Sequence, residues 1–74
     1  MTVYSLTEII GNAGCYGVYS TKESAIEAAK HYIKDWEYDN IEETNWNGYH
    51  KKIYYGNEDA GGCFEICIHE LNSW

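Results

Sequence analysis

The sequence predicts an α+β domain in which an antiparallel sheet of about five strands carries one helix on one face. Several short segments alternate apolar and polar residues with the period of a strand. Between them, one segment repeats apolar residues at helical spacing. The resulting order ββαβββ is that of a two-layer sandwich. With 74 residues, the chain is expected to form a single domain, residues 1–74.

The first two strands are predicted to form a hairpin. Residues 2–10 alternate, with Tyr4, Leu6 and Ile10 on one side. The Gly-Asn-Ala-Gly segment that follows supplies turn residues, so residues 15–19 can return as the second strand.

The helix is predicted to begin near Ser20 and to end near Trp36. Ser20 and Glu23 match a capping box, in which the serine side chain accepts a hydrogen bond from a backbone amide and the glutamate reaches back to the cap. We expect the apolar stripe of this helix to pack on the sheet, and its members are Ala25, Ile26, Ala29, Tyr32, Ile33 and Trp36.

A second hairpin is predicted around Asn47-Gly48, a dipeptide typical of tight turns between strands. Its strands are expected at residues 41–46 and 49–55. With a two-residue loop, Glu43 is expected to face Lys52 as a cross-strand charge pair.

The last strand, residues 62–69, is predicted to have an apolar face with Phe64, Ile66 and Ile68. The opposite face carries Cys63, Cys67 and His69. One hypothesis makes these three residues the site of a small metal- or thiol-responsive regulator. The sequence has no Cys-x-x-Cys spacing, so the simpler expectation is reduced thiols, no metal and no cofactor.

The junction between second strand and helix, residues 17–25, reads Gly-Val-Tyr-Ser-Thr-Lys-Glu-Ser-Ala. It resembles the GVYST-KE-A junction of small, mostly uncharacterised phage and bacterial domains, and the resemblance covers residues 2–34. It implies the hairpin-then-helix order and a phage origin. The chain also lacks Pro, Arg and Gln and is rich in Ile, Lys, Asn and Tyr, a bias typical of AT-rich coding. The resemblance implies no catalytic or binding residue.

The net charge of −7 lies entirely in residues 35–74, because the carboxylates and lysines of residues 1–34 balance. An acidic field repels nucleic acid and acidic membranes and attracts basic surfaces. The chain also has no arginine, so we expect no direct binding to nucleic acid. With no membrane segment in view, the expected location is the cytoplasm, or the host cytoplasm for a phage protein.

Residues 35–43 concentrate this charge, with five carboxylates interleaved with Trp36 and Tyr38. The leading hypothesis is a non-enzymatic module that docks an acidic-aromatic surface onto the basic, nucleic-acid-binding surface of a larger protein. For a phage protein, this would inhibit a host or defence protein by occlusion or nucleic-acid mimicry. The expected contact residues are Asp35, Glu37, Tyr38, Asp39, Glu42, Glu43, Trp46, Tyr49, Glu58 and Asp59.

Two further readings concern catalysis and self-association. No nucleophile, base and orienting acid occur in a recognisable pattern, so no catalytic residue is predicted. Exposed strand edges and aromatic residues also allow a homodimer or a larger self-associating structural module.

Overall fold

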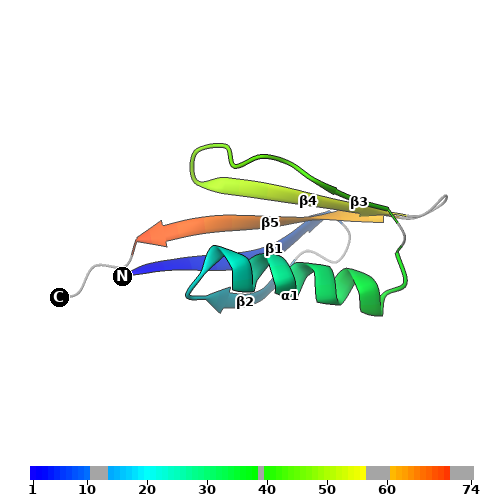
Figure 1. Ribbon diagram of the computed structural model, residues 1–74, viewed down its shortest axis with the longest axis horizontal. Helices are drawn as coiled ribbons and strands as arrows, with labels where there is room; N and C mark the ends of the chain where they lie inside the picture. The colour runs from blue at the N-terminus through cyan, green and yellow to red at the C-terminus, as the bar shows by residue number, and fades with distance from the viewer. Residues whose placement is uncertain (11–13, 39, 57–60, 71–74) are drawn as a thin grey trace.

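One helix packed across a five-stranded antiparallel sheet forms the molecule, as the sequence predicts (Figure 1). The computed structural model describes residues 1–10, 14–38, 40–56 and 61–70. Within these ranges the elements are β1 (Thr2–Ile10), β2 (Gly14–Tyr19), α1 (Lys22–Asp35), β3 (Asn40–Glu43), β4 (His50–Gly56) and β5 (Gly61–Glu70).

The strand order in the sheet is β2-β1-β5-β4-β3, and every neighbouring pair is antiparallel. The first and last strands of the described chain are therefore neighbours, and β5 lies at the centre. β2 and β3 form the two edges. This order was not predictable from the sequence pattern, because alternation marks strands without saying which of them pair.

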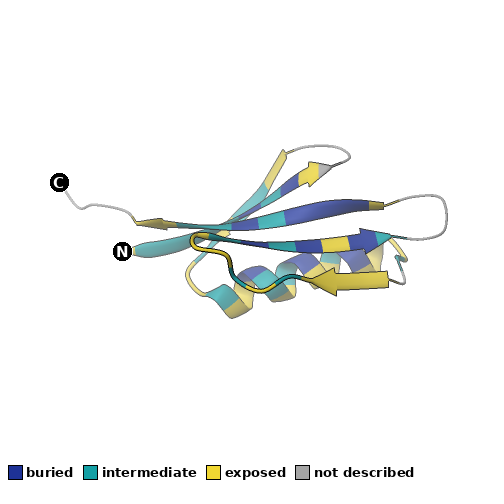
Figure 2. Cartoon of the chain, turned by 90° about the horizontal axis from the view of Figure 1, so that it is seen from above, coloured by how far each residue is buried: buried dark blue, intermediate teal, exposed yellow. Residues whose placement is uncertain are grey.

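The core lies between α1 and one face of the sheet. The helix contributes Ala25, Ala29 and Ile33, which recur at the predicted helical spacing and are fully buried. Figure 2 shows the buried positions concentrated along β4, β5 and the inner side of α1, while β3 is exposed throughout. The sheet contributes Leu6, Ile53, Tyr55, Phe64 and Ile66.

Thr21, not Ser20, caps the N-terminus of α1, so the predicted capping box is wrong by one residue. The backbone of Thr21 is extended, and its hydroxyl oxygen accepts the Ser24 N–H at 3.1 Å. The Thr21 hydroxyl also donates to the Ser24 side chain at 2.8 Å. Both Ser20 and Thr21 have suitable side chains, and the sequence alone does not distinguish them.

A Schellman motif ends α1. The Tyr38 N–H donates to the Ile33 carbonyl at 3.2 Å, and the Glu37 N–H donates to the Lys34 carbonyl at 3.0 Å. Glu37 occupies the left-handed position of this motif, with φ of 60°. That position favours glycine, because a Cβ atom strains the left-handed conformation.

Glu37→Gly is therefore expected to raise the free energy of unfolding by about 0.5–1 kcal/mol. Glycine relieves the left-handed strain, and it also removes a negative charge from the negative end of the helix dipole. Urea unfolding followed by tryptophan fluorescence measures the effect. Lys34→Gly, three residues earlier in regular helix, is the matched control and is expected to cost about 1 kcal/mol. Equal destabilisation by both substitutions would contradict the assignment.

The β3–β4 hairpin differs from the prediction by a one-residue shift in register. An isolated bridge joins Asn47 to His50, so Gly48 and Tyr49 are the two central turn residues. Gly48 takes the left-handed conformation there, with φ of 64°. As a result Glu43 pairs with Ile53 instead of Lys52 and faces the helix. A shift of one residue moves a side chain to the other sheet face, which changes the role of Glu43 completely.

Candidate functional site

The predicted contact residues do not form one surface. Asp35 lies on α1, and Glu42 lies on the open face, which we define as the sheet face away from α1. Glu43 lies on the opposite side of β3, toward the helix. Tyr49 is 79% exposed in the hairpin turn. Glu37 follows α1 at its C-terminal end, and the other acidic candidates, Asp39, Glu58 and Asp59, lie outside the described residues.

Glu43 is held by internal ion pairs. Its carboxylate lies 2.8 Å from the Lys30 amine of the helix and 3.5 Å from the Lys51 amine of β4. The Lys51 side chain is only 10% exposed and also donates to the Thr44 carbonyl at 2.6 Å. The hydrogen bond from Lys30 is the main reason that the pKa of Glu43 lies below its ordinary value. Glu43 therefore joins α1 to the sheet.

Glu43→Gln is expected to destabilise the fold by about 1–2 kcal/mol near pH 7, because the largely buried Lys51 loses its counter-charge. The lowered pKa means that the ionised carboxylate stabilises the folded state above about pH 4.5, and this stabilisation disappears as the pH falls through the folded-state pKa. The difference in the free energy of unfolding between wild type and variant should therefore become smaller as the pH is lowered. Urea unfolding at several pH values measures it, with Glu42→Gln on the open face as control. A gap that does not change with pH would contradict the ion-pair account.

Two predicted aromatic anchors are also engaged inside the molecule. The Lys22 amine lies 4.9 Å from the ring centroid of Trp46, a cation–π contact between the start of α1 and the β3–β4 connection. The ring of Tyr38 packs against that of Tyr55 at 4.7 Å. Both anchors are half-buried, so neither is fully available to a partner.

A buried carboxylate, Glu8, was not predicted. Its side chain is 4% exposed and accepts hydrogen bonds from the Tyr16 hydroxyl at 3.1 Å and from the Tyr55 hydroxyl. Burial, followed by the hydrogen bond to Glu8, raises the pKa of both tyrosines above their ordinary value. Glu8 shares the alternation of Tyr4 and Leu6, and this is the sequence signal that it points to the core.

Around Glu8 lies an aromatic cluster, whose rings contact one another with centroids 4.7 to 6.3 Å apart. Phe64 is its fully buried centre, and Trp36 stacks on Phe64 at 5.7 Å with 38% of its own surface exposed. The stripe residue Trp36 is thus partly a surface residue, although it packs on the core. The members of the aromatic cluster are Tyr16, Tyr32, Trp36, Tyr38, Tyr55 and Phe64.

The open face carries the predicted metal and thiol residues, but as separate groups. Cys63 is fully buried, and burial raises the pKa of its thiol. The Cys67 thiol donates to Glu65 at 3.3 Å, and burial together with this carboxylate raises its pKa to about 11. The imidazole of His69 is hydrogen-bonded to Ser5 at 2.9 Å. A thiol with so high a pKa is almost entirely protonated at neutral pH, which makes it a poor nucleophile.

His50 adds to this network, with its Nδ1 atom 3.5 Å from the second oxygen of Glu65. Among the residues that the structure describes, no three His, Cys, Asp or Glu side chains are placed to hold a metal ion together. The arrangement is that of a polar network in which Glu65 bridges β4 and β5.

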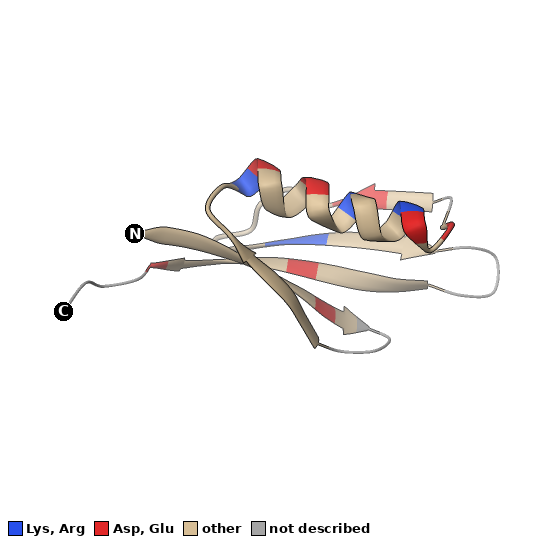
Figure 3. Ribbon diagram, turned by 90° about the horizontal axis from the view of Figure 1, so that it is seen from below, with Lys and Arg blue, Asp and Glu red and all other residues tan. Residues whose placement is uncertain are grey.

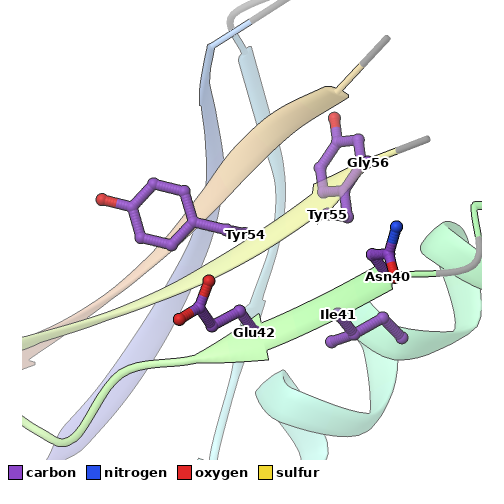
Figure 4. Close-up of a pocket in the computed structure, with 6 residues that line it drawn as sticks. All are labelled: Asn40, Ile41, Glu42, Tyr54, Tyr55 and Gly56. Atoms are coloured by element: carbon purple, nitrogen blue, oxygen red, sulfur yellow. The ribbon is translucent and has the colours of Figure 1, made fainter. Parts of the chain in front are cut away.

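Two open grooves flank the sheet. One lies beside β3 and β4 at the sheet edge, where Figure 4 shows Tyr54 and Glu42 on the same side of the two strands. Asn40, Ile41, Glu42, Tyr54, Tyr55 and Gly56 line it. The other groove, of about 610 Å³, runs along the side of α1 next to β2. We call it the α1–β2 groove, and it is lined by Tyr19, Ser24, Glu27, Ala28, His31, Tyr32 and Asp35.

Acidic and basic residues are interspersed along α1 (Figure 3), and four of them lie on two different sides of the helix. Lys22 and Lys30 turn toward the β3–β4 hairpin, where Trp46 and Glu43 hold them. The carboxylates Glu27 and Asp35 line the opposite side, in the α1–β2 groove, with Asp35 3.4 Å from His31. Lys34, in the last turn, is also exposed and directly precedes Asp35 in the sequence.

Comparison with known proteins finds no relative, because no family model, curated protein or solved structure matches the chain. Within the described ranges, no helix combines the length and the apolar character that a bilayer crossing requires. The function must therefore be argued from the surfaces themselves.

Proposed function

We propose that this protein is a non-enzymatic binding module whose acidic side, centred on the α1–β2 groove, docks onto a basic surface of a partner protein. One observation carries the proposal: two lysines of α1 are held on the β3–β4 side, which leaves Glu27 and Asp35 exposed beside Tyr19 and Tyr32. Carboxylates flanked by aromatic rings provide both charge and apolar contact for lysine or arginine side chains.

The chain-wide charge of −7 supports the same proposal, because it steers a basic partner toward the molecule from a distance. Asp39, Glu58 and Asp59 belong to this field through their charge. In the phage setting that the junction and composition suggest, the partner would be a nucleic-acid-binding host or defence protein. Docking would then inhibit that protein by covering its basic surface.

The experiment compares two doubly neutralised variants with equal net charge. Glu27→Gln with Asp35→Asn removes the carboxylates of the groove, and Glu42→Gln with Glu70→Gln removes two exposed carboxylates elsewhere. Partners are captured from host lysate at low salt and identified, and association with the purified partner is then measured across a salt series. We expect the groove variant to associate about tenfold more slowly at low salt and the control to resemble wild type.

Two results would contradict the proposal. If neither variant changes association, charge docking is wrong. If the Glu42 and Glu70 variant is the weaker one, the partner binds another surface. Because urea unfolding of both variants shows whether they remain folded, a loss of association cannot be confused with a loss of structure.

A further inference from the structure

We propose that the partner supplies an extended basic segment that adds as a new strand to the free edge of β2 and lies along the α1–β2 groove. This inference rests on the proposed function and names the kind of partner segment that the acidic side receives. It combines backbone pairing with β2 and side-chain contacts with α1, a known mode of peptide recognition at a sheet edge.

The composition of β2 favours strand addition at its free edge. In the described part of the chain β2 pairs only with β1, so its other edge presents unpaired backbone groups. Proteins usually protect such edges with charged residues, proline, β-bulges or very short strands. β2 is six residues long, reads Gly-Cys-Tyr-Gly-Val-Tyr, and holds neither a charge nor a proline. Val18 is 61% exposed on it.

β3, at the other edge of the sheet, differs from β2 in length and charge. β3 has four residues, and two of them are the carboxylates Glu42 and Glu43. It is both shorter and charged, as protected edges usually are. Of these protective features β2 carries a bulge in its register with β1, between Leu6 and Thr7, and residues 17–19 remain in regular pairing with β1.

The α1–β2 groove has the length of a short extended segment. The residues that line the groove extend along α1 from Ser24 to Asp35, a distance of about 16 Å at 1.5 Å per residue. About five residues of extended chain cover the same length. The groove and β2 are thus matched in length, and a strand paired with β2 would direct alternate side chains toward α1.

The carboxylates of the α1–β2 groove favour a basic segment. Side chains directed toward α1 would meet Glu27 and Asp35, with the rings of Tyr19 and Tyr32 beside them. Lysine or arginine at alternate positions satisfies both carboxylates. A second copy of this chain is a poor occupant, because each copy carries a net charge of −7.

The test uses fluorescein-labelled octapeptides that alternate lysine with valine, together with the same peptides carrying glutamate in place of lysine. Binding to the full chain is measured by fluorescence anisotropy. We expect the lysine peptide to bind with a Kd in the micromolar range and the glutamate peptide not to bind. The affinity of the Glu27→Gln, Asp35→Asn variant for the lysine peptide should be lower by about fivefold or more. The Glu42→Gln, Glu70→Gln control should bind like wild type.

Two lysine peptides with N-methyl groups on alternate residues identify strand addition. One methylates the amides that would face β2, and the other methylates those that would face solvent. The peptide methylated on the amides that face β2 should bind at least tenfold more weakly, whereas the peptide methylated on the solvent-facing amides should bind normally. Binding of the unmethylated peptide should slow amide hydrogen exchange in residues 14–19. Equal binding by both registers, or protection elsewhere, overturns strand addition.

The outcomes also separate this inference from the proposed function. If the purified partner still associates in a salt- and groove-dependent way but residues 14–19 gain no protection in its complex, docking stands and strand addition is wrong. If the protein alone shows a concentration-dependent mass with slowed exchange in residues 14–19, a second copy occupies the edge and the basic-segment inference is wrong.

Discussion

Phe64→Ala is expected to lower the free energy of unfolding by about 3–5 kcal/mol, the range found for truncating a large buried ring. Phe64 is fully buried and contacts the rings of Tyr16, Tyr32, Trp36 and Tyr55. For a chain of 74 residues, about 4–11 kcal/mol is a typical total. The variant should therefore be marginally folded or unfolded at 25 °C, as far-UV circular dichroism and urea unfolding would show.

Two controls belong to this experiment. Phe64→Leu keeps most of the apolar volume and should retain the fold with a smaller loss. Val18→Ala removes apolar atoms from an exposed strand position and should change stability by less than about 0.5 kcal/mol. A Phe64→Ala protein as stable as wild type would show that the aromatic cluster is not the centre of the core.

Tyr55→Phe is expected to cost about 2 kcal/mol, because Glu8 then loses one of its two tyrosine hydroxyl donors while remaining buried. Tyr54→Phe removes the same group from the neighbouring residue, which is 39% exposed, and should be nearly neutral. Adding Glu8→Gln to Tyr55→Phe should cost less than the two single losses together, because the residues share one hydrogen bond. Strict additivity would contradict the network.

The contact between Tyr55 and Glu8 also predicts that the free energy of unfolding depends on pH in alkaline solution. An unfolded tyrosine loses its proton near pH 10, whereas burial and Glu8 raise the pKa of Tyr55 in the folded state. The folded protein therefore holds this proton more tightly, and its stability should fall as the pH rises above about 10. Tyr55→Phe should make this decrease of the free energy of unfolding with pH less steep. Tyr16, whose pKa is also raised, should account for part of the pH dependence that remains in the variant.

The sequence predicted the fold class and element order correctly because both follow from local periodicity. Alternation defined the strands, and Ala25, Ala29 and Ile33 defined the buried side of the helix. The apolar face of the last strand was confirmed by the burial of Phe64 and Ile66. These patterns need no knowledge of which strands are neighbours.

The site was harder to predict because it depends on register and on pairing between distant residues. The one-residue shift at Gly48 and Tyr49 turned Glu43 toward Lys30 and Lys51, so a predicted contact residue forms ion pairs within the molecule. The groove residue Glu27 was not among the predicted contacts, because the position of α1 beside β2 is a tertiary feature. Trp46 is half-buried and contacts Lys22, a residue of α1 that is distant in the sequence.

The pairing of β1 with β5 also determines when the molecule can form during synthesis. Thr2 pairs with Glu70, 68 positions further along the chain, and β5 separates the first hairpin from the second within the sheet. Loop closure over such a distance is slow, and it must precede most of the stabilising contacts. The two hairpins and the helix should thus not assemble into the complete sheet until β5 is available to pair with β1 and β4. Until then the uncharged edge of β2 and the edge of β1 that later pairs with β5 are open to other strands, which makes the nascent chain the stage most exposed to aggregation.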